Sequence, residues 1–228
     1  MPTTGKSQNR ELLVKAARML GPVLEDLVFV GGCATALLIT DEAAGDVRPT
    51  FDVDAITKVS SYAQYNVFSQ RLRDLGFHED QSEGSPLCRW RNDDVILDVM
   101  PVEESILGFS NRWYNDVIQT AACLDLEPNV TIRVVTAPYF VATKLEAFNG
   151  RGKADLQLSQ DLEDLVCGID GRSTVIDEIN SAGADLSKYI ASEIRGLLNN
   201  PDFLGALPGF LLPDAASQRK IAAFIEKA

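Results

Sequence analysis

Histidine is nearly absent from this chain of 228 residues, which contains only His78. A hydrolase with a Ser-His-Asp or Cys-His arrangement would have to use that one residue, and the sequence contains no Gly-x-Ser-x-Gly nucleophile motif. His78 falls where a helix is expected to run into a strand, which favours a surface or turn position. Because histidine-rich metal sites are excluded, we expect catalysis to depend on carboxylates, and carboxylates favour hard cations such as Mg2+.

Closely spaced cysteine pairs and long apolar runs are also missing. The four cysteines form no Cys-x-x-Cys motif, which argues against a zinc site and favours free, buried thiols in a reducing cytoplasm. No stretch approaches the roughly 20 apolar residues of a membrane span. The first twenty residues contain no basic start followed by an apolar segment. We therefore expect a cytoplasmic protein without membrane contact.

Basic residues are in deficit. The chain has 21 Lys and Arg against 33 Asp and Glu, a formal net charge of −12. This balance argues against broad, nonspecific binding of nucleic acid, but not against a nucleic acid held by a local basic patch. Arg89 and Arg91 share one face of a predicted strand, and Arg151 and Lys153 follow a predicted helix. These residues are equally compatible with such a patch and with scattered surface charges.

The hydrophobic pattern predicts strands first and helices afterwards, which is typical of an α+β protein. Strands are expected at residues 27–30, 51–57, 87–91, 95–101, 122–126 and 130–135, with helices at 9–20, 34–39 and 60–75. Five further helices are expected at residues 139–148, 159–169, 174–182, 185–198 and 213–227. We expect an α/β core over residues 1–136 and a helical domain over residues 137–228.

Two glycines lie directly between the first predicted strand and the helix after it. Gly31 and Gly32 would let the backbone approach a ligand closely, and the N-terminus of the helix would offer free N–H groups to a phosphate. A Gly-Gly pair at this position is, by itself, more often only a tight turn. Whether this pair belongs to a ligand-binding site therefore depends on the other residues expected near it.

Three aspartates accompany it. Asp52 and Asp54 share one face of the second predicted strand, because side chains alternate along a strand, and an exposed acidic strand end is the plain alternative. Asp98 lies within an otherwise apolar strand, where an unpaired carboxylate is costly. If the two strands are neighbours, the three carboxylates form one cluster that can hold two magnesium ions.

The order Gly31-Gly32, Asp52-x-Asp54 and a later strand with Asp98 resembles the signature of the polymerase-β-like nucleotidyltransferase superfamily. Further segments are similar to the AbiEii-like and MenT-like nucleotidyltransferases, which occur as toxins of type IV toxin–antitoxin systems. These segments are VATKLEAF (141–148), GRG (150–152), SQDLEDL (159–165) and IDGR (169–172). The resemblance implies a mixed sheet with flanking helices, followed by a helical C-terminal half.

The resemblance also implies roles for individual residues. Asp52 and Asp54 would bind the metal, and Asp98 would be the third metal-binding carboxylate and help to deprotonate the acceptor. Gly31 and Gly32 would contact a nucleoside triphosphate. Lys144 would contact its phosphates, and Asp161 would orient Lys144. Without the resemblance, both of these helix residues would be taken as ordinary surface charges. The spacing from Gly32 to Asp52 is longer than is common in the superfamily, and the loop at residues 40–49 accounts for the excess.

The acceptor of the nucleotide is less defined by the sequence. The resemblance favours an RNA, such as transfer RNA, and a toxin that is inhibited by an antitoxin protein. A small hydroxylated molecule such as an antibiotic suits the acidic composition better. A nucleotide-binding module without catalysis is a third reading, although a module that only binds would not require the third carboxylate.

Overall fold

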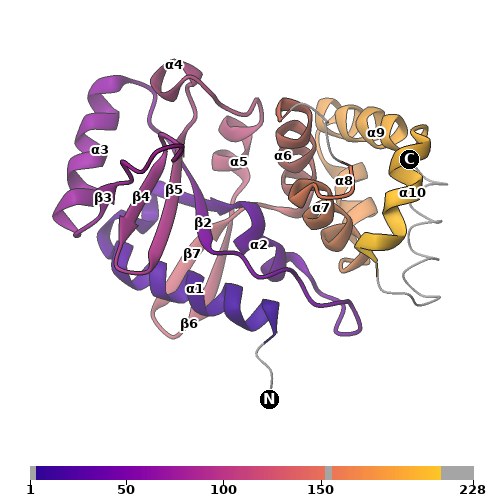
Figure 1. Ribbon diagram of the computed structural model, residues 1–228, viewed down its shortest axis with the longest axis horizontal. Coiled ribbons are helices and arrows are strands. Elements are labelled where there is room, and N and C mark those ends of the chain that lie inside the picture. The colour runs from indigo at the N-terminus through magenta and orange to yellow at the C-terminus, as the bar shows by residue number, and fades with distance from the viewer. Residues whose placement is uncertain (1–3, 152–155, 212–228) are drawn as a thin grey trace. The chain divides into compact units, whose positions relative to one another are not determined.

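The computed structural model describes residues 4–151 and 156–211, which form two compact units (Figure 1). The first unit comprises Met1–Ala36 and Arg48–Thr136, and the second comprises Leu37–Val47 and Ala137–Ala228. The helix predicted at residues 213–227 lies outside the described residues. No helix in the described part of the chain is long and apolar enough to cross a membrane.

The first unit contains a seven-stranded sheet in the order β3-β4-β5-β2-β1-β7-β6. Two neighbouring pairs, β2 with β5 and β1 with β7, are parallel, and the others are antiparallel. The strands are β1 (Leu27–Val30), β2 (Asp52–Thr57), β3 (His78–Glu79), β4 (Arg89–Asn92), β5 (Val95–Pro101), β6 (Ala122–Glu127) and β7 (Val130–Val134). The interior strand β1, between β2 and β7, is buried along its whole length, as its four apolar residues predict.

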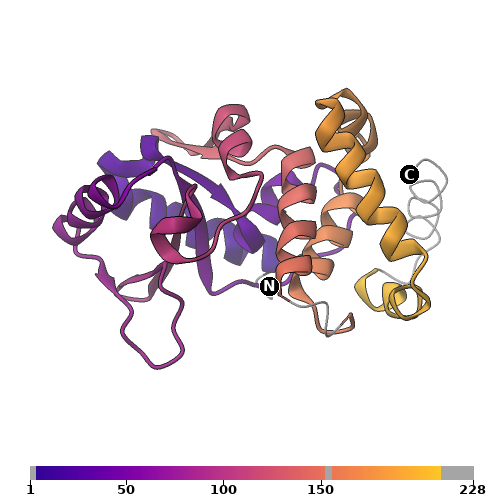
Figure 2. The ribbon, with the colours of Figure 1, turned by 90° about the horizontal axis from the view of Figure 1, so that it is seen from above.

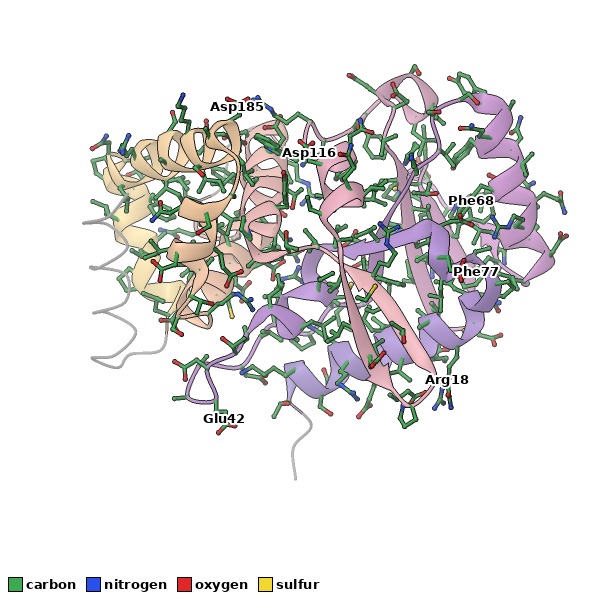
Figure 3. The ribbon with its side chains drawn as sticks, turned by 180° about the vertical axis from the view of Figure 1, so that it is seen from behind. Arg18, Glu42, Phe68, Phe77, Asp116 and Asp185 are labelled. Atoms are coloured by element: carbon green, nitrogen blue, oxygen red, sulfur yellow. The ribbon has the colours of Figure 1, made fainter. Side chains whose placement is uncertain are left out.

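Five α-helices and one 3-10 helix accompany this sheet. They are α1 (Gly5–Leu20), η1 (Gly21–Asp26), α2 (Gly31–Leu38), α3 (Tyr62–Asp74), α4 (Glu104–Leu107) and α5 (Tyr114–Thr120). The Thr4 side chain caps α1 by accepting a hydrogen bond from the Ser7 N–H, and the helix ends at Gly21, before a proline. Helix α1 packs across β2, β5, β6 and β7. Figure 3 labels two buried aromatic residues, Phe68 on α3 and Phe77 just after that helix.

The second unit is helical in its described residues. It contains α6 (Ala137–Gly150), α7 (Gln160–Asp170), α8 (Val175–Ser181), α9 (Ala184–Leu198), α10 (Pro201–Ala206) and η2 (Leu207–Phe210), which Figure 2 shows from above. Helix α6 packs against α7, α8 and α9, and it is buried on most of its surface. A side chain at Gly168 would meet the Phe140 ring at 2.9 Å, so α6 and α7 approach each other closely.

The segment Leu37–Val47 belongs to the second unit because it is held at the end of α7. The backbone N–H groups of Thr40 and Asp41 both donate to the Gly171 carbonyl oxygen, at 2.9 and 3.0 Å. Gly171 has no side chain, and a Cβ there would lie 2.7 Å from the Ile39 side chain. Most of the loop predicted at residues 40–49 therefore packs as part of the helical unit.

The α+β prediction, with a mixed sheet followed by helices, is confirmed. The predicted bounds of β1 and β5 match the structure, and the turn between β4 and β5 has Asp93 at a positive φ of 50°. Helix α2 begins at Gly31, three residues earlier than predicted. The expectation that the cysteines are buried is wrong for Cys123, which is exposed, and for Cys167, which is partly exposed, and all four are thiols outside any disulfide bond.

Candidate active site

Two parallel strands bring the predicted aspartates together. Strand β2 pairs with β5 in a register that places Asp54 opposite Asp98. Neighbouring strands lie about 4.8 Å apart, so these two residues are direct neighbours in the sheet. Val53 is fully buried, whereas Asp52 and Asp54 are partly exposed on the opposite face. The alternation expected for Asp52 and Asp54 is therefore present, and Asp98 is adjacent to them.

Arg89 on β4 lies against two of these carboxylates. Its Nε donates to Asp98 Oδ1 at 2.8 Å, and its Nη2 donates to Asp98 Oδ2 at 2.7 Å. The same Nη2 donates to Asp52 Oδ2 at 2.8 Å. The hydrogen bonds to Asp98 raise the pKa of Arg89, so its positive charge is permanent. One guanidinium thus joins carboxylates from two strands.

Both arginines of β4, considered equally as a basic patch and as scattered surface charges, are paired with acids. Arg89 is paired with Asp98 and Asp52, and Arg91 donates through Nε to Asp80 Oδ2 at 2.6 Å. The hydrogen bonds from Ser82 and from Arg91 hold the pKa of Asp80 well below its usual range. Lys153, also considered for a patch, lies outside the described residues. Each arginine of β4 thus has an acidic partner on a different segment, which the sequence pattern alone does not indicate.

Gly31 is required by the position of Asp54. It has a φ of +68°, and a Cβ at this residue would lie 1.9 Å from Asp54 Oδ2. Glycine alone adopts this conformation without strain and leaves the space that the carboxylate fills. Strand β1 places Val30 opposite Asp54, and α2 begins at the next residue. Gly31 thus allows a strand to turn into a helix directly beside the carboxylate, and Gly32 is buried in that first turn.

Hydrogen bonds hold the start of β2 in place. The Thr50 hydroxyl donates to Asp52 Oδ1 at 2.9 Å. The side chain of Asn9, fully buried on α1, accepts from the Thr50 N–H at 2.9 Å and donates to the Arg48 carbonyl oxygen at 3.0 Å. The helix α1 therefore positions Asp52 through two residues that the sequence interpretation did not identify. The helical spacing that places Leu13 on the buried face of α1 also places Asn9 there, four residues earlier, and this was the signal for its role.

Lys144 and Asp161 are in contact within the second unit. Lys144 Nζ donates to Asp161 Oδ1 at 3.2 Å and to Asp164 Oδ2 at 2.6 Å, and Arg151 donates to Asp161 Oδ2 at 2.7 Å. Lys144, Asp161 and Asp164 are only 7%, 5% and 2% exposed, so the alternative of a surface charge is wrong for the two predicted residues. Asp164 was not identified from the sequence, although it lies three residues after Asp161, on the same face of α7.

The metal-binding capacity of the carboxylates depends on Arg89. Within residues 4–151 and 156–211, no group of three or more His, Cys, Asp or Glu side chains is arranged to hold a metal ion. The carboxylate oxygens of Asp52, Asp54 and Asp98 are the donors that Mg2+ prefers. However, Arg89 Nη2 already lies between Asp52 Oδ2 and Asp98 Oδ2. The carboxylate oxygens are therefore the kind of donor that magnesium binds, but in this structure they are arranged around the guanidinium of Arg89.

Cys88 lies beside these carboxylates, and it should resist thiol reagents. Burial raises its pKa to about 12, and the charges of Asp98 and Asp54 add to this effect. At pH 8 only about 1 in 10⁴ of such thiols is a thiolate, the reactive form. We expect exposed Cys123 to react fastest with Ellman's reagent and Cys88 to react only after unfolding.

The labelling can be read by mass spectrometry of peptides. The Cys123→Ser variant should lose the fast phase, because Cys33 is buried and Cys167 is only partly exposed. Rapid labelling of Cys88 in the folded protein would contradict its burial beside the aspartates.

Comparison with known proteins locates this fold. No protein-family model matches the chain, and no curated protein matches it. Among solved structures, an antigenic nucleotidyltransferase-like protein from Paracoccidioides brasiliensis is 19% identical and has a TM-score of 0.53. The match covers 88% of this chain and 92% of that one. This likeness shows the fold, without showing the activity.

Two structures of the antibiotic-resistance factor ANT(2'')-Ia are also similar, at a lower level. The solution structure is 13% identical with a TM-score of 0.46, covering 83% of this chain and 93% of that one. The crystal structure with adenylyl-2''-tobramycin is 14% identical with a TM-score of 0.44, covering 82% and 98%. At these TM-scores they carry no conclusion about this chain. The first likeness and the sheet topology together establish a nucleotidyltransferase-like fold.

Proposed function

We propose that this protein is a metal-dependent nucleotidyltransferase, which transfers a nucleoside monophosphate from a nucleoside triphosphate to an acceptor hydroxyl. The observation that carries the proposal is the pairing of Asp54 with Asp98 on adjacent parallel strands. Asp52 shares the face of Asp54, and Gly31 at the start of α2 lies directly against the Asp54 carboxylate. Carboxylates beside a glycine at a helix start suit a reaction between a metal-bound triphosphate and a hydroxyl group.

In the proposed reaction the acceptor hydroxyl attacks the α-phosphorus, and the bond from that phosphorus to the pyrophosphate oxygen breaks. Asp98 helps to remove the hydroxyl proton, and the backbone at Gly31 and Gly32 contacts the phosphates. Two magnesium ions, held by Asp52, Asp54 and Asp98, would neutralise the charge that develops. Lys144 is proposed to contact the phosphates, with Asp161 orienting it. The protein's work in such transfers is mostly positioning and charge neutralisation.

The proposed acceptor is an RNA, such as transfer RNA, as in the type IV toxins that the sequence resembles. An antitoxin protein would then hold the enzyme inactive in the cytoplasm. The support for this acceptor is the resemblance carried by the segments around Lys144 and Asp161 and by the aspartates of the first unit.

A small hydroxylated acceptor is the second candidate, and one observation favours it. Arg89 and Arg91, which were considered as an RNA-binding patch, are both engaged with aspartates in a chain of net charge −12. A small acceptor needs no basic surface. Expression in a bacterial host separates the candidates, since a toxin should slow growth while its Asp52→Ala variant should not. A drug-modifying enzyme should instead raise survival in the presence of its drug.

The direct test is transfer of label. The purified protein is incubated with Mg2+, total cellular RNA and each α-labelled nucleoside triphosphate in turn. We expect label in a discrete RNA band, and a loss of roughly 10²–10³-fold or more in the Asp52→Ala/Asp54→Ala variant, because a charge-stabilising group is removed. Asp185→Ala, which removes an exposed acid on α9, is the matched control and should retain the rate.

Three outcomes are informative. Label in RNA that the double variant lacks would support the enzyme and identify its nucleotide. Nucleotide binding without label in RNA would favour a small acceptor first and a catalytically silent module second. Full transfer by the double variant would exclude these aspartates as the site.

A further inference from the structure

Arg89 places a positive charge among the candidate metal ligands. Arg89 makes three hydrogen bonds of 2.7 to 2.8 Å to Asp98 and Asp52. Both oxygens of Asp98 accept from it, and the Asp98 side chain is only 9% exposed. The guanidinium therefore bridges two strands, β2 and β5, from a third, β4.

The cluster needs a cation to be stable. Asp52, Asp54 and Asp98 together carry three negative charges within two neighbouring strands, and like charges so close repel each other. Arg89 offsets one of these charges, and arginine keeps its charge at any pH that a protein tolerates. It can leave the carboxylates only by moving its side chain, since deprotonation is not available.

The side chain of Arg89 can move without disturbing the sheet. The Arg89 N–H donates to the Pro86 carbonyl oxygen, and its own carbonyl oxygen accepts from the Asp80 N–H. These backbone bonds do not involve the guanidinium. The side chain is 21% exposed, so solvent reaches it directly.

We propose that Arg89 is a built-in counterion that competes with the divalent metal for Asp52 and Asp98. The proposal rests on the proposed function, because it assumes that these carboxylates bind a metal. In the metal-free protein Arg89 holds the carboxylates together. Metal binding requires the guanidinium to leave them, so the cation alone binds weakly.

The competition also gives Arg89 a role toward the nucleotide. A displaced guanidinium is a strong ligand for phosphate oxygens, which it can bind through two parallel hydrogen bonds. A metal–triphosphate complex supplies a cation for the aspartates and an anion for the arginine at the same time. We therefore expect the metal and the triphosphate to bind much more tightly together than the metal alone.

The test measures metal affinity without catalysis. Binding of Mn2+ to the full chain is followed by electron paramagnetic resonance for the wild type, Arg89→Gln, Arg89→Lys and Arg91→Gln. We expect Arg89→Gln to bind Mn2+ at least about tenfold more tightly than the wild type. We also expect Mg2+ to raise the melting temperature of Arg89→Gln by more than it raises that of the wild type. Arg91→Gln removes the same charge from the same strand, but its partner is Asp80, so its Mn2+ affinity should change little.

The sign of the effect separates competition from a structural role. If Arg89 had only a structural role, its removal would make the site less ordered and would weaken metal binding. Mn2+ affinity in Arg89→Gln that equals or falls below the wild-type value would overturn the proposal. If Arg89→Gln does not fold without metal, Arg89→Lys decides, because lysine keeps the charge but loses the bridging geometry and should bind Mn2+ more tightly than the wild type.

The two proposals fail in different ways. Tighter Mn2+ binding in Arg89→Gln, in a protein that labels no acceptor, would support the counterion and count against the proposed reaction. Acceptor labelling with unchanged Mn2+ affinity would support the reaction and overturn the counterion.

Discussion

Replacing Gly31 with alanine should reduce nucleotidyl transfer by at least about 10²-fold, comparable to the loss of a charge-stabilising group. A Cβ at residue 31 would lie 1.9 Å from Asp54 Oδ2 and 2.6 Å from its carboxyl carbon, so the carboxylate must move. In addition, alanine at a φ of +68° costs about 1–2 kcal/mol in backbone strain. The displaced carboxylate would no longer face Asp98 in its present register.

A matched control separates the collision from the strain. Gly84 also has a positive φ, +79°, but a Cβ there would meet no atom within 4 Å. Gly84→Ala should therefore lose stability without losing transfer, whereas Gly31→Ala should lose transfer. Both variants are compared by initial rate and by thermal melting followed by circular dichroism. Unimpaired transfer by Gly31→Ala would show that the position of Asp54 does not matter for the reaction.

Replacing Lys144 with methionine should destabilise the protein by about 3–5 kcal/mol, because two buried carboxylates lose their shared cation. Asp161 and Asp164 are 5% and 2% exposed, so water cannot compensate for the loss. Arg151 still contacts Asp161 in this variant, whereas Asp164 loses the hydrogen bond of 2.6 Å that it accepts from Lys144. The free energy of unfolding is measured by chemical denaturation.

Arg151→Gln provides the comparison for this prediction. The Arg151 side chain is 73% exposed, and ion pairs of exposed residues contribute about 0–1 kcal/mol. Its loss should thus have a small effect on stability although it contacts the same Asp161. If Lys144→Met instead kept its stability and lost only transfer, the contact of Lys144 with the phosphates would be its main role.

Several elements of the fold follow directly from local patterns. Leu27–Val30 is an apolar run that ends at glycine, and Val95–Pro101 follows an Asn-Asp-Asp turn, so both strands have clear boundaries. The start of α2 does not follow in this way. Glycine disfavours a helix, yet Gly31 begins one, because its positive φ lets the chain turn sharply beside Asp54.

Some features of the candidate site also follow from a local sequence pattern, and others depend on tertiary packing. The shared face of Asp52 and Asp54 follows from alternation along one strand, whereas the partner of Arg89 depends on how two strands pair. The pairing of Arg89 with Asp98 could have been predicted from the sequence, because a tight turn that pairs Asn92 with Val95 necessarily places residue 89 opposite residue 98. The burial of Lys144 could not be predicted from the sequence, because it depends on how α7, α8 and α9 pack around α6.

The hydrogen bonds from Thr40 and Asp41 to Gly171 have a consequence for how the chain can be divided. The polypeptide passes from one unit to the other three times, after residues 36, 47 and 136. A single cut after Thr136 would therefore leave the N-terminal fragment still carrying a piece of the helical unit. The excised C-terminal fragment would lack the Ile39 side chain that covers Gly171. The helical unit is thus a discontinuous domain, assembled from an internal excursion of the chain and its C-terminal part.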